Sequence, residues 1–122
     1  MKMSRAIVVD EFKVGKRKCV VVKMIDKGRY VTSLGYWHNG YVQKHKRTKK
    51  RGWSYDKAMS ECGEDLPEEL TFEGKLGALL TDETEYWGFD TMHVGDNAET
   101  QKFETVRYRT IELAKYLIKK RI

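Results

Sequence analysis

The stretch "EYWGFDTMHVGDN", residues 85–97, lies where a strand pattern gives way to a helix pattern. Its first part has the period of two that is typical of a strand. One face of that strand would carry Tyr86, Gly88, Asp90 and Met92, and the other would carry Trp87, Phe89, Thr91 and His93. The Gly-Asp-Asn that follows is typical of a turn. We therefore expect a core strand that runs into a turn just before a helix.

The segment after this turn predicts the longest helix of the chain. Its apolar positions recur at helical spacing and form one stripe on a helix of about residues 100–120. The stripe consists of Phe103, Val106, Thr110, Leu113, Ala114, Leu117 and Ile118. Lys119, Lys120 and Arg121 suit the negative C-terminal end of such a helix.

The N-terminal half predicts strands. "RAIVVDEF" (5–12) and "KCVVVKMI" (18–25) are rich in β-branched residues. "DKG" (26–28) predicts a turn that leads into "RYVTSLGYW" (29–37). Asn39-Gly40 is a stronger turn signal, because both residues tolerate the positive φ of a type I′ hairpin. We expect an antiparallel meander over about residues 5–44.

Three further segments complete the chain. "KHKRTKKRG" (44–52) is dominated by like charges, which predicts a mobile loop or an extended arm. "WSYDKAMSECG" (53–63) predicts a short helix that Ser54 caps and Gly63 ends. "LTFEGKLGALL" (70–80) predicts a strand and a turn. The expected fold class is α+β: an antiparallel β-sheet meander packed by a long C-terminal helix plus one short helix.

Length and composition limit the classes of protein to consider. The 122 residues fit a single domain, 1–122. The sequence contains neither an apolar run long enough for a membrane helix nor a signal-peptide pattern. Cys19 and Cys62 have no CxxC spacing, which argues against a zinc site or a disulfide framework. We expect no membrane association, no cofactor, and a location in the cytoplasm.

The charge is distributed unevenly. Residues 1–60 carry sixteen Lys or Arg and four Asp or Glu, a net charge of +12. Residues 61–122 carry eight against fourteen, a net charge of −6. A basic half indicates an anionic partner such as a nucleic acid, a nucleotide or a phosphate, or else a solvated surface.

Catalytic chemistry has weak support in the sequence. Asp90, His93 and Asp96 have spacing that a metal-dependent hydrolase would use, but in a strand Asp90 and His93 would face opposite sides. We expect instead a capped turn, in which Asp96 or Asn97 accepts hydrogen bonds from backbone N–H groups. The sequence contains no GxSxG motif and no glycine-rich phosphate loop.

Binding chemistry has more support. Aromatic faces could stack on bases, and the candidates are Tyr36, Trp37, Tyr41, Trp53, Tyr86, Trp87 and Phe89. Arg107 and Arg109 lie off the apolar stripe of the last helix. Their guanidinium groups would either contact a base or a phosphate, or pair with Glu104 or Glu112.

An ordered set of motifs resembles a family of small phage proteins. The set is "NGYV" (39–42), "LTFEG" (70–74) and "EYWGFDTMHVGD" (85–96), followed by a helix. The family pattern runs G-Y-V, H-G-G-L-T-[YF]-x-G and W-[WF]-x-G-F-D-x-x-H-x-G-D. The resemblance covers about residues 39–118, and its last block is the most specific. The chain departs from the pattern at "PEE" (67–69) and in its basic segment.

The resemblance extends to phage anti-defence sponges of the first Thoeris type. It implies a homo-oligomer that sequesters cyclic ADP-ribose isomers, with cyclic oligonucleotides as a second ligand class, without cleaving them. Trp87 would then stack on adenine, while Asp96 and Asn97 would meet ribose or base edges. Arg107 or Arg109 would face the phosphates. His93 stays open between a buried hydrogen bond and a ligand contact.

One alternative is a nucleic-acid-binding accessory protein that uses the basic segment as a phosphate-tracking arm. The arm would consist of Lys44, Lys46, Arg47, Lys49, Lys50 and Arg51. The other alternative is the metal-dependent hydrolase described above.

Overall fold

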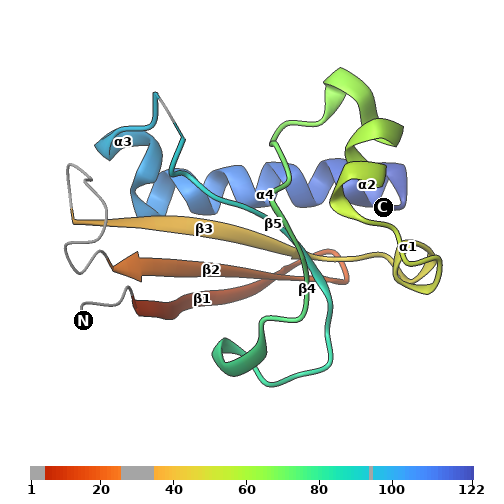
Figure 1. Ribbon diagram of the computed structural model, residues 1–122, viewed down its shortest axis with the longest axis horizontal. Coiled ribbons are helices and arrows are strands. Elements are labelled where there is room, and N and C mark those ends of the chain that lie inside the picture. Colours follow the sequence, from red (N-terminus) through yellow and green to blue (C-terminus); the bar gives the residue numbers. More distant parts are fainter. Residues whose placement is uncertain (1–4, 26–34, 94) are drawn as a thin grey trace.

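The computed structural model describes residues 5–25, 35–93 and 95–122. Five antiparallel strands form one sheet in the order β1-β2-β3-β5-β4. The strands are β1 (Arg5–Val14), β2 (Arg17–Ile25), β3 (Tyr36–Gln43), β4 (Phe72–Gly74) and β5 (Tyr86–Phe89). The long helix α4 (Phe103–Lys120) runs along one face of this sheet (Figure 1). The α+β class is confirmed, but the meander holds only for β1 to β3, because β5 lies between β3 and β4.

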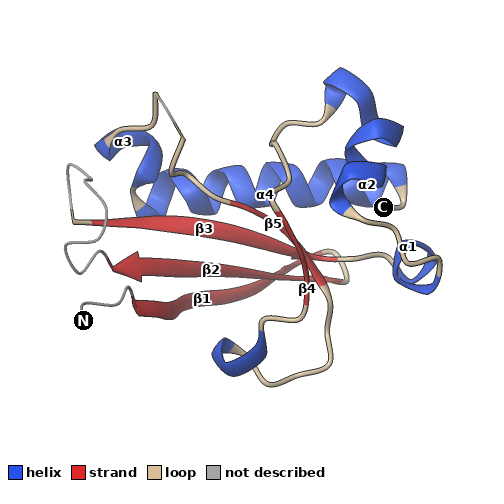
Figure 2. Ribbon diagram, in the orientation of Figure 1, coloured by secondary structure: helices blue, strands red, loops and turns tan. Residues whose placement is uncertain are grey.

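Short helices occupy the two ends of the sheet (Figure 2). They are α1 (Lys46–Lys50), α2 (Tyr55–Cys62) and α3 (Ala98–Gln101), with 3-10 turns η1 (Gly63–Asp65) and η2 (Gly77–Leu79). The α2 prediction is confirmed: the Ser54 hydroxyl accepts from the Lys57 N–H at 3.1 Å, and Gly63 ends the helix with φ +67°. Across the described ranges, no helix has the length and apolar character that a membrane crossing requires.

The predicted turn at Asn39-Gly40 is wrong, because both residues lie inside β3. Gly40 pairs with Val21 on one side and with Phe89 on the other, so it sits in a central strand. The hairpin turn is found instead between β1 and β2, at Gly15 and Lys16. Gly15 has φ +58°, as the first position of a type II′ turn requires. The predicted turn at 26–28 lies outside the described residues.

The core has two layers, one on each face of the sheet. The layer beneath α4 includes Val21, Val42, Trp87, Phe89, Leu113 and Leu117. The opposite layer includes Val20, Val22, Tyr41, Leu76 and Tyr86, with Leu79 and Leu80 packed against it. Tyr86 and Trp87 thus face opposite sides, as the period of two predicted.

The last strand is shorter than predicted. β5 ends at Phe89, because the Asp90 carboxylate accepts from the Met92 N–H at 3.0 Å and turns the chain. The helix predicted over about 100–120 is interrupted at Lys102, which has an extended backbone (φ −71°, ψ 157°). The Gln101 carbonyl, which a continuous helix would use, accepts instead from the ring of His38.

The predicted mobile loop at 44–52 is also wrong. Residues Lys46–Lys50 form α1, and the His45 ring nitrogen caps its start by accepting from the Arg47 N–H at 2.9 Å. Tertiary contacts outweigh the repulsion between like charges here. Thr48 is fully buried, and its hydroxyl donates to the Ile122 carbonyl at 2.8 Å.

Candidate functional site

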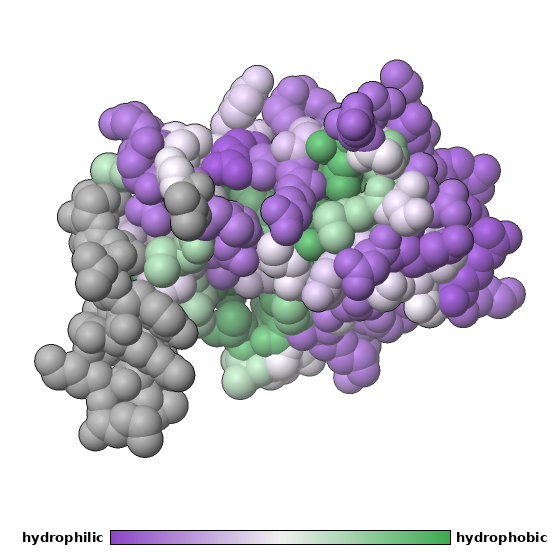
Figure 3. Space-filling model, turned by 45° about the horizontal axis from the view of Figure 1, so that its top comes forward, coloured by the Kyte–Doolittle hydropathy of each residue, from purple (hydrophilic) through white to green (hydrophobic). Residues whose placement is uncertain are grey.

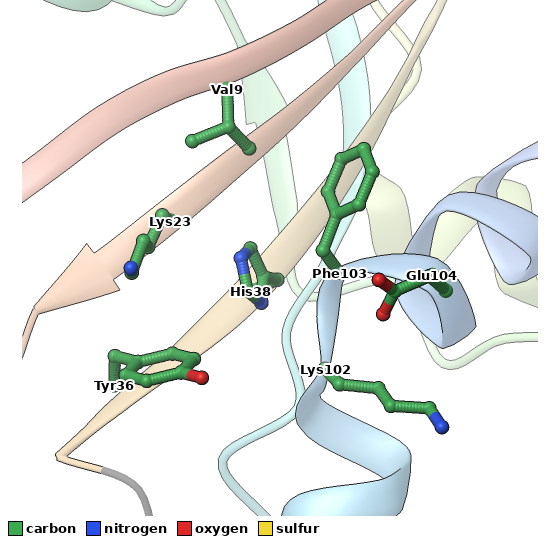
Figure 4. Close-up of a pocket in the computed structure, with 7 residues that line it drawn as sticks. All are labelled: Val9, Lys23, Tyr36, His38, Lys102, Phe103 and Glu104. Carbon is green, nitrogen blue, oxygen red and sulfur yellow. The ribbon is translucent and has the colours of Figure 1, made fainter.

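A pocket of about 340 Å³ lies between the start of α4 and the strands β1, β2 and β3 (Figure 4). It is lined by Val9 of β1, Lys23 of β2, Tyr36 and His38 of β3, and Lys102, Phe103 and Glu104 at the start of α4. This volume falls at the lower end of the range for small-molecule sites. The pocket therefore joins the N-terminal sheet to the C-terminal helix.

Strand geometry explains why the sheet residues meet there. Tyr36 and His38 are two residues apart in β3, so they point to the same face. Lys23 is the partner of His38 in the register of β2 and β3, which places it on that face too. Figure 4 shows these side chains and the start of α4 around one shared space.

His38 is the most buried side chain of the pocket, with 4% of its surface exposed. Its Nδ1 lies 2.8 Å from the Gln101 carbonyl oxygen. A carbonyl can only accept, so Nδ1 carries the proton and Nε2 keeps the lone pair in the neutral ring. Burial lowers the pKa of His38, and the nearby Lys23 ammonium lowers it further. The ring is thus neutral at physiological pH and presents an acceptor nitrogen.

A closed set of hydrogen bonds holds this ring in place. The Thr91 hydroxyl donates to the His38 carbonyl at 2.8 Å, and the Gln101 side-chain amide donates to the Thr91 carbonyl at 2.8 Å. The His38 ring completes the set by donating to the Gln101 carbonyl. All three residues are buried. The stretch after β5 therefore positions the pocket without lining it.

Aromatic edges and ammonium groups surround the opening. The His38 ring meets the rings of Tyr36 and Phe103 edge-on, at centroid distances of 5.8 and 5.9 Å. The Lys23 Nζ lies 4.3 Å from the centroid of Tyr36. Lys102 pairs with Glu99 at 2.8 Å, a hydrogen bond that raises the pKa of Lys102. The pocket thus combines ring surfaces, cations and one neutral acceptor.

None of the six ligand-binding residues predicted from the sequence lines this pocket. Trp87 is fully buried, and its Nε1–H donates to the Ile122 carbonyl at 3.1 Å. The Lys44 ammonium lies 4.4 Å from the centroid of the Trp87 indole. A ring without an exposed face cannot stack on a ligand in this conformation, so Trp87 serves the core here.

The turn residues act on the backbone, as the capped-turn interpretation predicted. Asn97 caps α3, because its side-chain oxygen accepts from the N–H groups of Glu99 and Thr100 at 2.9 and 3.2 Å. Asp96 accepts from the His93 N–H at 2.9 Å and from the Thr100 hydroxyl at 2.9 Å. The capping prediction is confirmed for both Asp96 and Asn97.

The bend after β5 brings His93 between two carboxylates. Its ring nitrogens lie 3.4 Å from Asp90 and 3.5 Å from Asp96. In the part of the chain that the structure describes, these residues and their neighbours form no group of three or more His, Cys, Asp or Glu that could hold a metal ion. The His93 ring is exposed rather than buried.

Arg107 and Arg109 both form ion pairs in the described structure, with Asp10 and Glu68 in place of the predicted Glu104 or Glu112. The Arg107 Nε lies 2.8 Å from Asp10, and its guanidinium lies 4.4 Å from the Phe12 centroid. Arg109 binds both carboxylate oxygens of Glu68, at 2.8 and 2.6 Å. This bidentate bond raises the pKa of Arg109. The two arginines connect α4 to β1 and to the segment before β4.

Comparisons of the chain with protein-family models, with curated proteins and with solved structures give no match.

The pocket residues were largely missed by sequence reasoning. Only Tyr36 is among the aromatic residues that the sequence suggested as stacking platforms. The alternation in "YWHN" (36–39), which puts Tyr36 and His38 on one face, was the available signal. The sequence around Lys102 and Phe103 contains no comparable signal, because their position beside β3 depends on the break between α3 and α4.

The six cations of the predicted arm fall into two groups. Lys44 is buried, with its ammonium 3.8 Å from Glu73 and 3.5 Å from Glu85, so it serves the core. Arg47 is half-buried and donates to the Arg121 carbonyl at 2.9 Å. The exposed members are Lys46, Lys49, Lys50 and Arg51.

Proposed function

We propose that this protein binds a nucleotide-class small molecule in the pocket at the start of α4 and holds it without converting it. The observation that carries this proposal is the combination of ring surfaces, ammonium groups and a neutral acceptor around one space. A nucleotide presents the three complementary groups: a flat base, a phosphate, and hydroxyl or amino donors.

Each group of such a ligand has a partner. The base would stack on Tyr36 or Phe103, an interaction of about 1–3 kcal/mol per base. The phosphates would pair with Lys23 and Lys102, since an ammonium is a common partner of phosphate. A ribose hydroxyl or an exocyclic amine would donate to Nε2 of His38. The pocket itself has one carboxylate, Glu104, which would accept from a second hydroxyl.

The resemblance to the phage anti-defence sponges reduces the number of candidate ligands. On that basis we infer that it is a cyclic nucleotide immune signal, either a cyclic ADP-ribose isomer or a cyclic oligonucleotide. The protein would act inside the bacterial host by removing the signal from solution. The family's residues for this role do not match the pocket residues, so the proposal places the ligand on the pocket rather than on Trp87.

A homo-oligomer belongs to the same proposal. β1 is an edge strand of the described sheet, and it exposes Ile7 and Val9 by 37% and 41%. Val9 also lines the pocket. A second protomer against this edge would bury both side chains and would close the pocket from that side. A closed pocket would bury a larger part of the surface of a small anionic ligand.

Native mass spectrometry tests the proposal. The purified protein is incubated with cyclic ADP-ribose isomers and cyclic oligonucleotides, measured intact, and then heat-denatured to recover the ligand. We expect an oligomer that carries one of these ligands and releases it chemically unchanged. A converted ligand would refute binding without turnover, and a protein that binds none of these probes would refute the cyclic-nucleotide assignment.

Variants then assign the ligand to the pocket. Tyr36→Ala and Lys102→Glu should each weaken binding by at least about tenfold, or about 1.4 kcal/mol. Lys16→Glu changes an exposed cation in the β1–β2 turn and serves as the control. Equal affinities for all four proteins would show that the ligand binds elsewhere. Circular dichroism of each variant checks that the fold is retained.

A further inference from the structure

Cations from two distant segments gather at one end of the molecule. α1 and the last turn of α4 lie side by side there, next to the last residue, Ile122 (Figure 1). Hydrophilic side chains dominate this end in the space-filling view (Figure 3). We call it the basic end, and its exposed cations are Lys46, Lys49, Lys50, Arg51, Lys119, Lys120 and Arg121.

Specific contacts fix the two segments to each other. The Arg47 guanidinium donates to the Arg121 carbonyl at 2.9 and 3.2 Å. The His45 N–H and the Thr48 hydroxyl both donate to the Ile122 carbonyl at 2.8 Å. The cations are therefore displayed on a folded surface rather than on a free arm.

The cations of the basic end differ in their ion pairing from the cations that lie next to them along the chain. Neighbouring cations have acidic partners, for example Lys57 with Glu61 at 2.8 Å and Lys115 with Glu112 at 3.2 Å. Within the described ranges, no ion pair involves any of the seven cations of the basic end. Such crowding of like charges opposes folding, and an anionic partner would relieve it.

The positive charges of the basic end lower the pKa of a neighbouring histidine. His45 lies at the start of α1, and its pKa is lowered first by burial and then by Arg17, Arg121, Arg47 and Lys46. Arg121 and Lys46 are thus close enough to His45 to disfavour a further positive charge. Cations of both segments therefore act on the same side chain.

We propose that the basic end binds the phosphate backbone of a nucleic acid without sequence preference. Lys and Arg side chains neutralise phosphates one by one, and the affinity then depends steeply on salt. This activity goes beyond the proposed small-molecule binding. The two sites lie at opposite ends of α4, whose 18 residues span roughly 27 Å.

A membrane surface fits the basic end less well. Amphipathic membrane helices present a large apolar face beside their cations. The only residue of α1 that is not Lys or Arg is Thr48, which is buried. Trp53 is half-buried, and Arg47 and Lys57 lie 5.2 and 5.6 Å from its ring centroid. Neither residue offers an apolar anchor.

Charge reversal at the basic end tests the proposal. Fluorescence anisotropy measures the binding of labelled single-stranded DNA, single-stranded RNA and duplex DNA, each of about 20 nucleotides or base pairs, between about 50 and 200 mM salt. We expect the unmodified protein to bind all three, with an affinity that falls steeply as salt rises. The variant K49E/K50E/R51E should bind at least about tenfold more weakly at low salt and should show a flatter salt dependence.

A matched control variant distinguishes the effect of a specific binding site from the effect of the protein's net charge. The variant R5E/K13E/K16E reverses three exposed cations of β1 and its turn, so it carries the same net charge as K49E/K50E/R51E. We expect it to retain binding within about threefold. Equal losses in both variants, no binding by the unmodified protein, or tighter binding to anionic lipid vesicles than to nucleic acid would each overturn the proposal. None of these outcomes bears on ligand binding in the pocket.

Discussion

Gly40 determines how closely the helix approaches the sheet. It lies in β3 beneath α4, and a Cβ atom there would collide with the Thr110 hydroxyl. The same atom would lie 2.5 Å from the Phe89 ring. The residue is therefore glycine because of a close approach and not because of a turn. The Asn-Gly pair therefore matches the sequence pattern of a hairpin turn by chance, although it lies in a central strand.

Gly40→Ala should destabilise the protein by about 1–3 kcal/mol, because it overpacks a fully packed core. Urea unfolding followed by circular dichroism measures the loss of unfolding free energy. A change below about 0.5 kcal/mol would show that Thr110 and Phe89 move aside at no cost.

A second substitution controls for this mechanism. Thr110→Ala removes the hydroxyl that a Cβ at position 40 would meet. In the double variant Gly40→Ala/Thr110→Ala, the cost should be smaller than the sum of the two single costs. Simple additivity would mean that Gly40→Ala does not act through Thr110, which would leave the Phe89 ring as the group that it displaces.

Local side-chain chemistry was predictable at the scale of single residues, and distant pairing was not. Ser54 and Asn97 cap the helices that follow them, and a cap bonds to backbone groups two or three residues away. Arg107 bonds to Asp10, which is 97 residues away. Such a partner depends on the topology of the whole sheet, which no short motif specifies.

At the scale of elements, α1 shows why the basic segment was misassigned. Its composition predicts a mobile loop, and α1 has only five residues. A helix this short is unstable by itself, and tertiary hydrogen bonds stabilise it. The Ile122 carbonyl accepts from the His45 N–H, the Thr48 hydroxyl and the Trp87 indole N–H. These donors come from two distant segments, α1 with its cap and β5. The strands β1 and β2, by contrast, were predictable because their apolar pattern is local.

Thr48→Val should loosen α1 specifically. The substitution keeps the shape of the side chain but removes the hydroxyl that bonds to Ile122 at 2.8 Å and to His45 at 3.0 Å. The Ile122 oxygen keeps its bonds from His45 and Trp87, so the loss of this one hydrogen bond should cost about 1 kcal/mol of unfolding free energy. Hydrogen exchange should become faster at the Lys49 and Arg51 amides, which close the turns of α1.

Thr105→Val is the matched control for this prediction. Thr105 also lies in a helix, near the start of α4 and away from Ile122. Hydrogen exchange in α1 should be unchanged in this variant. Faster exchange throughout the sheet in Thr48→Val, with none specific to α1, would indicate a general loss of stability instead.

The whole molecule places its two candidate sites at opposite ends of α4. The pocket could not be predicted from the sequence, because four separate segments form it and the break at Lys102 lets α4 start beside β3. The basic end was partly visible as a charge run, but its second half lies at the other end of the chain. Both sites therefore depend on how α4 crosses the sheet.

Acidification should destabilise the whole molecule through two histidines. The pKa of His38 is lowered mainly by burial and then by Lys23, and that of His45 mainly by burial and then by nearby arginines. Both start from an ordinary value of 6.5. Between each folded pKa and 6.5, the unfolded chain binds more protons than the folded one. The free energy of unfolding is therefore highest above pH 6.5 and falls as the pH decreases below it.

Urea unfolding at about pH 7 and about pH 5 measures this loss. The variant His38→Gln/His45→Asn removes both titrating rings, and asparagine retains a side-chain oxygen to cap α1. Its unfolding free energy should change less over this interval than that of the unmodified protein. An identical pH dependence in the two proteins would show that neither histidine resists protonation in the folded state. The pocket would then present a protonated ring, which can only donate, once the pH falls below the ordinary value of 6.5.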